Sequence, residues 1–352
     1  MDPRRLRAGT VSAMQTWTIV GELGSASGGD GPEPLLASTD LSAVTGWTPK
    51  PEGWCRGDEC RPATLLGEVA TAPELAPERI ATALGAAYAV DAEHRIAVIG
   101  SRRDESGTLR SGAAPDIELP GVDGARHGLF DRSDGKTLVV AFSSWCGCRY
   151  DLPGWDSLRG ELAEHDFDVV AVAIDENVAA AAPWAEGLDL PVLVDTERTF
   201  ADAYGLVNVP TVLWVDEERN VVRRPSTEFS DDQFTSVHGV ESGPHLEAVR
   251  RWVTDGELPD DADRPGDDLG ALSDDQLQAR AEFRLAVELA RRGLTEAAAA
   301  RVAVADALAP DDFTIWRAGM QLVGDDPFGA EFFDRYTEWQ QRHGGPLQVT
   351  ES

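Results

Sequence analysis

Two cysteines separated by a single glycine, Cys146 and Cys148, follow an apolar run and precede an amphipathic stretch. The apolar run is Leu138–Phe142 and the amphipathic stretch is Leu152–His165, so the pattern predicts a strand, a tight turn and a helix. A thiol at the start of a helix faces unpaired backbone N–H groups and the positive end of the helix dipole. Both favour the thiolate, which is the reactive form of cysteine. The pattern therefore predicts redox-active thiols in preference to two buried cysteines that only pack.

Residues 113–258 continue this alternation of strand and helix signals. Short runs rich in β-branched residues alternate with amphipathic or alanine-rich stretches, which is typical of an α/β fold with a central sheet. Beyond the first strand, strands are predicted at Val169–Ile174, Pro191–Val194, Thr211–Val215 and Asn220–Arg223. Helices are predicted at Asn177–Glu186, at Thr199–Tyr204 and from a capping Ser242 to Asp255.

The segment before this domain, residues 1–112, is predicted to form a small α+β module of unknown role. A strand is expected at Trp17–Val20, a helix at Leu75–Leu84, and a hairpin formed by Ala87–Val90 and Ile96–Ile99. After the domain, residues 259–270 form an acidic linker, because their Pro, Gly and Asp content opposes regular structure.

Residues 271–352 are predicted to be helical throughout. Gly293, Pro310 and Gly324 divide this tail into helical hairpins. The predicted helices are Asp274–Arg292 capped by Ser273, Glu296–Ala309 capped by Thr295, Phe313–Val323 and Phe328–Gln341.

The charge of the chain limits its partners. There are 62 acidic against 31 basic residues, and the formal net charge is −31. Phosphate backbones and anionic membrane surfaces would be repelled, so we expect neither nucleic acid nor membrane as a partner. No apolar run is long enough to span a bilayer, and no apolar segment follows the N-terminal arginines as a secretory signal would require. These observations predict a cytoplasmic protein.

A second cysteine pair, Cys55 and Cys60, lies in the N-terminal module. Three interpretations are open: ordinary thiols in a turn, an auxiliary redox pair, or half of a metal site, in that order of preference. The histidines show no metal-binding spacing, and the Gly-rich stretch Gly24–Gly31 lacks the features of a phosphate-binding loop. We therefore assign no metal and no cofactor.

Three segments of the middle domain occur in an order that resembles the thioredoxin-like superfamily. Ala114–Gly124 (APDIELPGVDG) looks like a lead-in strand and hairpin, and residues 138–153 (LVVAFSSWCGCRYDLP) look like the first strand and the start of the active-site helix. Tyr204–Val222 is similar to the segment that carries a cis-proline, with Pro210 in that role. The resemblance is greatest to the redoxin branch of thiol–disulfide oxidoreductases, which includes cytochrome-maturation reductases. It implies a thioredoxin-like α/β domain and disulfide exchange.

The chain departs from this family in one respect. The family pattern has two residues between the cysteines, and here only Gly147 separates them. A Cys-Gly-Cys disulfide closes a smaller, more strained ring, so the pair is expected to be more oxidising if the disulfide forms. The other possibility is that it does not form and one thiol alone is catalytic.

The resemblance assigns roles to individual residues. Cys146 is expected to be the more exposed thiol and the nucleophile, and Cys148 is expected to resolve the mixed disulfide. Arg149 either supplies positive charge to the thiolate or is a solvated surface arginine. Asp151 is either a proton acceptor near Cys148 or, preferably, a complement to the helix start. The peptide bond before Pro210 is expected to be cis.

Two further residues are assigned to substrate binding. Trp145 precedes the first cysteine, and the backbone of Val209 is expected to lie beside the thiols, where an extended substrate could pair with it. The expected partners are protein or small-molecule thiols and disulfides.

The tail adds a weaker resemblance. The string GLTEAAAARVAVADALAPDD is similar to tetratricopeptide-type helical hairpins over about one and a half repeats. Because three repeats are the usual minimum for a free-standing stack, the tail is expected to pack against another domain or subunit, and it could bind a protein partner.

Two alternatives to disulfide exchange stay open. Ser143-x-x-Cys146 faintly resembles the peroxidatic motif of peroxiredoxins, which would make the protein a thiol peroxidase. The third interpretation is a non-enzymatic interaction scaffold, in which neither cysteine is needed.

Overall fold

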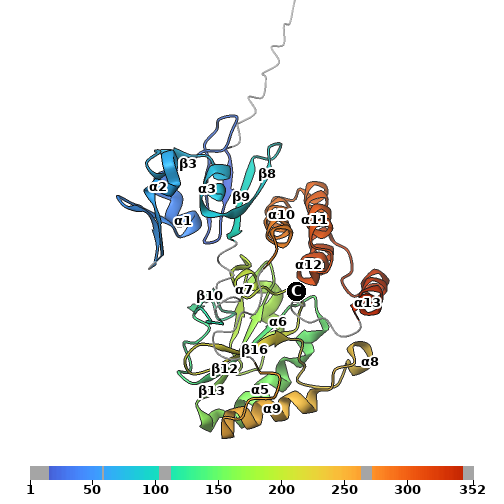
Figure 1. The fold of residues 1–352 in the computed structure, drawn as a ribbon. Coiled ribbons are helices and arrows are strands. Elements are labelled where there is room, and N and C mark those ends of the chain that lie inside the picture. The colour runs from blue at the N-terminus through green and yellow to red at the C-terminus, as the bar shows by residue number, and fades with distance from the viewer. Residues whose placement is uncertain (1–15, 58, 103–111, 263–271, 344–352) are drawn as a thin grey trace, which may run out of the picture.

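The computed structural model describes residues 16–57, 59–102, 112–262 and 272–343, and it has three parts (Figure 1). An N-terminal module is drawn in blue, a middle domain in green and yellow, and a C-terminal helical region in orange and red. Most of the predicted linker lies outside the described residues. Among those residues, no helix combines the length and the apolar character needed to cross a membrane.

The middle domain is built on a five-stranded sheet with the strand order β14-β13-β12-β15-β16. Strands β14, β13 and β12 are parallel, and β15 and β16 continue the sheet in antiparallel fashion. The bounds are β12 Lys136–Phe142, β13 Phe167–Ala173, β14 Val192–Val194, β15 Thr211–Val215 and β16 Val221–Ser226. A short hairpin precedes the sheet, β10 (Leu119–Pro120) with β11 (Arg126–His127). All five predicted strands are confirmed.

The central strands are apolar because helices cover both faces of such a sheet. The residues of β13 are all buried, and β12 is buried from Thr137 onward. The helices are α5 Leu152–Glu161, α6 Val178–Ala185, α7 Thr199–Ala203, α8 Thr235–His238 and α9 Ser242–Asp255. Ser242 is the first residue of α9 and its N-cap is Glu241, so the predicted Ser242 cap is wrong.

The N-terminal module contains three small sheets. Its main sheet has the order β2-β1-β9-β8, and it includes the predicted hairpin of β8 (Ala86–Asp91) and β9 (Ile96–Arg102). The other strands are β1 Thr18–Val20, β2 Ser25–Ser27, β3 Leu36–Ala37, β4 Thr48–Lys50, β5 Gly53–Arg56, β6 Glu59–Pro62 and β7 Glu74–Leu75. The helices are α1 Leu41–Thr45, α2 Ala63–Leu66 and α3 Pro77–Leu84.

Four helices form the C-terminal region, close to the predicted bounds. They are α10 Asp274–Arg291, α11 Thr295–Leu308, α12 Phe313–Val323 and α13 Ala330–His343. Ser273 caps α10 in a reciprocal capping box with Gln276, as predicted. Thr295 lies inside α11, and the N-cap is Leu294, so the predicted Thr295 cap is wrong.

Helix α10 joins the three parts because it is apolar on opposite faces. Ala279, Phe283 and Val287 belong to the core of the middle domain. Ala281, Leu285 and Leu289 pack with Val98 and its neighbours on the N-terminal sheet. A helix that is hydrophobic all round is a buried helix. The tail therefore packs against the other two parts of the same chain.

Arg280 lies on α10 at the centre of this contact and is fully buried. Its guanidinium donates to Asp202 of α7 at 2.7 Å and to Asp312, the N-cap of α12, at 3.1 Å. It also donates to the carbonyl oxygens of Ala201 (3.0 Å) and Leu206 (2.6 Å). Burial of a cation is tolerable only when such partners replace water.

We predict that Arg280→Met lowers the free energy of unfolding by about 3–5 kcal/mol at pH 7, because two carboxylates are left buried without their cation. In the wild type, burial raises the pKa of Asp202, but the Arg280 charge outweighs it and the pKa is lowered. The Arg280–Asp202 pair therefore stabilises the folded state until the pH falls through the lowered pKa of Asp202. In the variant the unpaired carboxylates take up protons more readily, so its deficit should shrink at pH 5.

Urea unfolding at pH 7 and pH 5 measures both effects. Arg291→Met on the same helix is the control. The Arg291 side chain is 39% exposed, so its removal should lower the free energy of unfolding only slightly. An Arg280→Met variant as stable as the wild type at pH 7 would contradict the prediction.

Candidate active site

The two predicted redox cysteines lie between β12 and α5. Cys146 has an extended backbone and is followed by a 3-10 turn, Gly147–Asp151, that leads into α5. The backbone N–H of Cys148 donates to Cys146 Sγ over 3.3 Å. The sulfur therefore receives a backbone donor at the start of a helical turn, which is the placement that stabilises a thiolate.

Pro210 lies beside this turn. The Val209–Pro210 peptide bond is cis, as predicted, and β15 begins at the next residue. Cys146 Sγ is 3.4 Å from the carbonyl oxygen of Val209, to which the protonated thiol donates. The structure thus brings Cys146, Cys148, Val209 and Pro210 together.

Both thiols are buried: Cys146 is 4% exposed and Cys148 is 3% exposed, so exposure does not distinguish the two as the sequence led us to expect. Both line a cavity of about 200 Å³, which we call the active-site cavity. Its other lining residues are Gly147, Asn208, Val209, Pro210, Thr227, Phe229, Phe234, Val237, His238, Arg317, Phe328, Phe332, Phe333 and Tyr336.

The two thiols have opposite pKa shifts. Burial raises the pKa of Cys146, but the hydrogen bond from the Cys148 thiol and the positive charge of Arg317 outweigh it and lower the pKa to about 6. Burial raises the pKa of Cys148 well above its usual value, and the hydrogen bond with Cys146 and the nearby negative charges raise it further. At neutral pH the pair therefore holds one thiolate, on Cys146, and one thiol.

Arg317 was missed by the sequence analysis, which named Arg149 either as the cation for the thiolate or as a solvated surface arginine. Arg317 lies on α12, far along the chain, and its Nε donates to Pro327 O over 3.0 Å. Its guanidinium lies 3.7 Å from the ring centre of Phe332. The one signal in the sequence was an arginine within the mostly apolar stretch Phe313–Val323.

Arg149 is neither the main cation for Cys146 nor a solvated arginine. It donates to Ser144 O over 2.5 Å, and its guanidinium stacks 4.4 Å from the ring centre of Trp184. On the other side of that loop, Asp175 accepts hydrogen bonds from the backbone and hydroxyl of Ser144. Arg149 and Asp175 therefore fix the backbone immediately before Trp145 and Cys146.

Asp151 is the N-cap residue of α5, so it lies at the helix start where the preferred interpretation places it. Its side chain makes no capping hydrogen bond, and Oδ1 accepts from the backbone N–H groups of Ser230 (3.1 Å) and Asp231 (3.3 Å). Burial raises its pKa to about 7, with a further contribution from the Asp231 charge. The other oxygen, Oδ2, is buried and has no hydrogen-bond partner among the described residues. A carboxylate with these properties suits proton transfer at neutral pH.

Trp145 is 3% exposed and does not line the active-site cavity as the structure describes it. The predicted role of Trp145 in substrate binding therefore has no support from its position. Val209 does line the cavity, and its pairing with a substrate stays a prediction.

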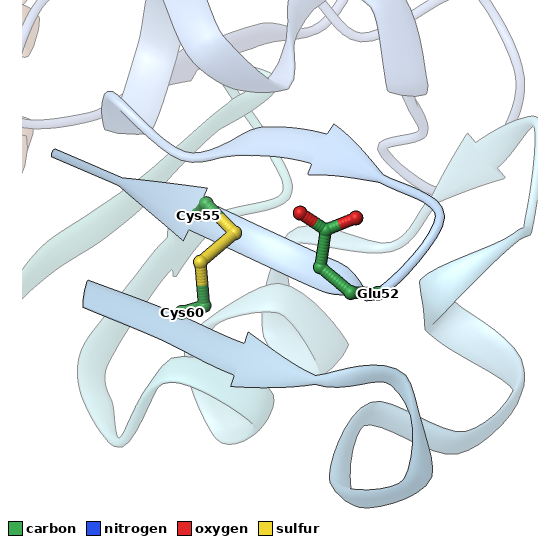
Figure 2. Close-up of side chains that lie close together, drawn as sticks. All are labelled: Glu52, Cys55 and Cys60. Carbon is green, nitrogen blue, oxygen red and sulfur yellow. A yellow bond between two sulfur atoms is a disulfide. The ribbon is translucent and has the colours of Figure 1, made fainter. Parts of the chain in front are cut away.

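The second cysteine pair is a disulfide, so the prediction of ordinary thiols is wrong. Cys55 on β5 and Cys60 on β6 are directly opposite each other in the antiparallel pair and are bonded (Figure 2). The carboxylate of Glu52 lies beside them, and these three residues form the one group of potential metal ligands found in the described part of the chain. Sulfurs bonded to each other offer no thiolate, so this structure does not present a metal site.

Comparison with known proteins places the middle domain. Residues 110–240 match the family model described as Redoxin. The thiol-disulfide oxidoreductase ResA of Geobacillus thermodenitrificans is 26% identical over 111 residues, which cover 31% of this chain and 64% of that protein. ResA of Bacillus subtilis is 26% identical over 113 residues, which cover 31% of this chain and 63% of that protein. The match thus spans slightly less than two thirds of these relatives.

Two solved structures are also similar in sequence to part of this chain. The pneumococcal exposed lipoprotein thioredoxin Etrx1 from Streptococcus pneumoniae is 29% identical, covering 39% of this chain and 99% of that structure with a TM-score of 0.32. A thiol:disulfide interchange protein of the thioredoxin family from Chlorobium tepidum is 25% identical. The match covers 32% of this chain and 83% of that structure, with a TM-score of 0.28.

We predict that Arg317→Met raises the midpoint of Cys146 alkylation from about pH 6 by about one unit or more, because the thiolate loses its nearest cation. Arg317→Lys should restore part of the shift. The rate of iodoacetamide labelling as a function of pH, with the modified cysteine identified by mass spectrometry, gives the midpoint.

Arg149→Met is the matched control, since it removes a neighbouring guanidinium that stacks on Trp184. A larger shift in this variant than in Arg317→Met would restore Arg149 as the cation for the thiolate.

Proposed function

We propose that this chain, whose residues 110–240 match the Redoxin family model, is a thiol–disulfide oxidoreductase that works through Cys146 and Cys148. The observation that carries the proposal is the geometry at Cys146. Its sulfur receives the Cys148 N–H, lies 3.4 Å from Val209 O, and has a pKa lowered to about 6. A thiolate at neutral pH is the species that attacks a disulfide.

The first step is attack of the Cys146 thiolate on one sulfur of a substrate disulfide. The substrate S–S bond breaks as the new S–S bond to Cys146 forms, and the leaving thiolate takes a proton. In the second step Cys148 attacks Cys146 Sγ, the mixed disulfide breaks, and the second substrate thiol leaves. Two electrons pass from the cysteine pair to the substrate, and an external dithiol restores the pair.

The second step needs the proton of Cys148 to be removed. The pKa of Cys148 is raised well above its usual value, so few molecules hold this thiolate at neutral pH. Asp151 lies on the same turn, its charge acts on Cys148, and its pKa of about 7 matches the working pH. We assign Asp151 as the proton acceptor for Cys148.

The alternatives receive less support from the structure. The peroxidase interpretation depends on Ser143. Its Oγ accepts a hydrogen bond from the Trp145 backbone N–H over 3.5 Å, and its hydroxyl donates to Asp175. A scaffold without chemistry would have no need for a buried thiolate with a lowered pKa. The two thiols therefore favour disulfide exchange.

The predicted cytoplasmic location stays a prediction. The Cys55–Cys60 disulfide is of a kind that persists most readily in oxidising compartments. Alkylation of thiols in intact cells, followed by reduction and a second label, would report whether this disulfide exists where the protein resides.

We predict that the full chain, with dithiothreitol as the electron donor, reduces insulin disulfides and that Cys146→Ser abolishes the reaction. Cys148→Ser should instead accumulate a mixed disulfide at Cys146, because attack can occur but resolution cannot. Insulin turbidity and intact mass spectrometry measure the two outcomes.

A peroxide-consumption assay on the same sample is the control for the peroxidase alternative. Full turnover by Cys148→Ser would show that Cys146 acts alone, and an inactive wild type would overturn the proposal.

We predict that Asp151→Asn slows resolution of the mixed disulfide by about 100-fold, within the usual contribution of general base catalysis. In the wild type this step should accelerate as the pH rises through about 7, the pKa of Asp151, and the variant should lose that inflection. Stopped-flow measurement of thiol release after single-turnover loading isolates the step.

Asp156→Asn, on the same helix, is the control and should behave as the wild type. An unchanged pH dependence of resolution in Asp151→Asn would contradict the assignment.

A further inference from the structure

The active-site cavity has a composition unlike that of the rest of the protein. The chain carries 62 acidic residues, yet none of the residues that line this cavity is acidic. The one lining residue with a formal positive charge, among those described, is Arg317. Burial lowers the pKa of His238 and raises that of Tyr336, so both stay neutral at pH 7. Apart from the thiolate and its cation, the wall of the cavity is uncharged and mostly apolar.

The outer wall comes from the helical tail. Phe332, Phe333 and Tyr336 project from α13, and Phe328 precedes that helix. The opposite wall comes from the middle domain, with Phe234 and Val237 at α8. Helices α13 and α8 face each other at the right of the molecule (Figure 1). The cavity is therefore closed by two segments about 100 residues apart in sequence, one of which lies outside the redoxin match.

The aromatic wall is held in place from behind. Phe332 stacks on Trp316 of α12 with ring centres 6.2 Å apart, and both belong to a cluster with Phe313, Met320, Tyr336 and Trp339. Arg335 of α13 pairs with Asp306 of α11 at 2.5 Å and donates to Pro310 O. A wall fixed by packing and an ion pair presents its aromatic faces without the entropy cost of ordering them.

The size of the cavity limits what it can hold. Sites for drug-sized ligands and cofactors span roughly 300–1,000 Å³. The active-site cavity, at about 200 Å³, is smaller and has the scale of one large side chain. Two of its rim residues, Val237 and Phe333, are 42% and 43% exposed, so the cavity opens to solvent between α8 and α13.

We propose that the active-site cavity is a substrate-binding site, in which the tail helix α13 and the α8 segment hold a large apolar side chain adjacent to the substrate's disulfide. The inference depends on the proposed disulfide exchange and adds the substrate class: protein or peptide disulfides flanked by an aromatic or aliphatic residue. Cys146 lines the same cavity, so a side chain bound there keeps the neighbouring substrate sulfur within reach of the thiolate. The tail is thereby part of the site that selects the substrate.

Peptide mixed disulfides with glutathione test this proposal on the full chain. We would compare peptides that are identical except for Phe, Ser or Asp beside the cysteine, with the substituted residue placed before or after it. The wild type should show kcat/KM about tenfold or more higher for a Phe peptide than for the Ser peptide, since an apolar group in a fitted pocket gives discrimination of this order. The Asp peptide should be the poorest substrate.

Phe333→Ala should lose most of the preference for Phe, and Phe333→Asp should abolish it. Phe333 is partly exposed, so neither change should unfold the tail; Val237→Ala, on the opposite wall, is a second variant that tests the same cavity. Val304→Ala on α11 is the control, because Val304 is also 42% exposed but lies outside the cavity.

The outcomes separate the two proposals. Equal kcat/KM for the Phe, Ser and Asp peptides, or an unchanged preference in both Phe333→Asp and Val237→Ala, would overturn the inference while leaving disulfide exchange intact. Failure of the wild type to react with any of the peptides would overturn the proposed function itself.

Discussion

The buried guanidinium of Arg280 is the interaction on which the arrangement of the three parts depends. It pairs with Asp202 of the middle domain and with Asp312, the N-cap of α12, and it donates to Leu206 O just before the cis-proline segment. The backbone N–H of Phe313 donates to Val207 O over 2.8 Å, so the start of α12 is bonded to the same segment. Because a buried cation needs all its partners to offset the loss of water, these contacts form together. The tail and the loop that carries Val209 and Pro210 are thereby held in one geometry.

This attachment explains how a protein with a net charge of −31 keeps a thiolate at a buried site. Burial alone would raise the pKa of Cys146, and the overall negative field acts in the same direction. Three interactions at the sulfur compensate: the hydrogen bond from the Cys148 thiol, the backbone N–H at the start of the 3-10 turn, and the charge of Arg317 from α12. Two of these come from the Cys-Gly-Cys turn and the third from the tail. The electrostatics of the thiol pair in the middle domain are therefore completed by a segment outside that domain.

Much of the fold could be predicted from the sequence because it is encoded locally. Alternating apolar runs marked the five strands of the central sheet, and Ser273 with Gln276 marked the start of α10. The cis peptide at Pro210 followed from a resemblance carried by adjacent residues. The roles of Asp151 and Arg149 and the accessibility of Cys146 were judged from neighbours in sequence. Their surroundings are set by Ser230, Trp184 and the tail aromatics, which only tertiary packing brings near.

The tail is not a separate module, because α10 packs on both other parts of the chain. A tetratricopeptide-like stack of about one and a half repeats would leave apolar faces uncovered. Here one face of α10 packs on the N-terminal sheet and the opposite face packs on the middle domain. Gly100 of β9 allows this approach, because a Cβ at that position would lie 3.0 Å from the Cβ of Ala281. With α10 fixed between two sheets, α12 and α13 have a rigid base from which to reach the thiols. The N-terminal module, remote from the chemistry, thus contributes to the active site by supporting the helix that carries Arg280.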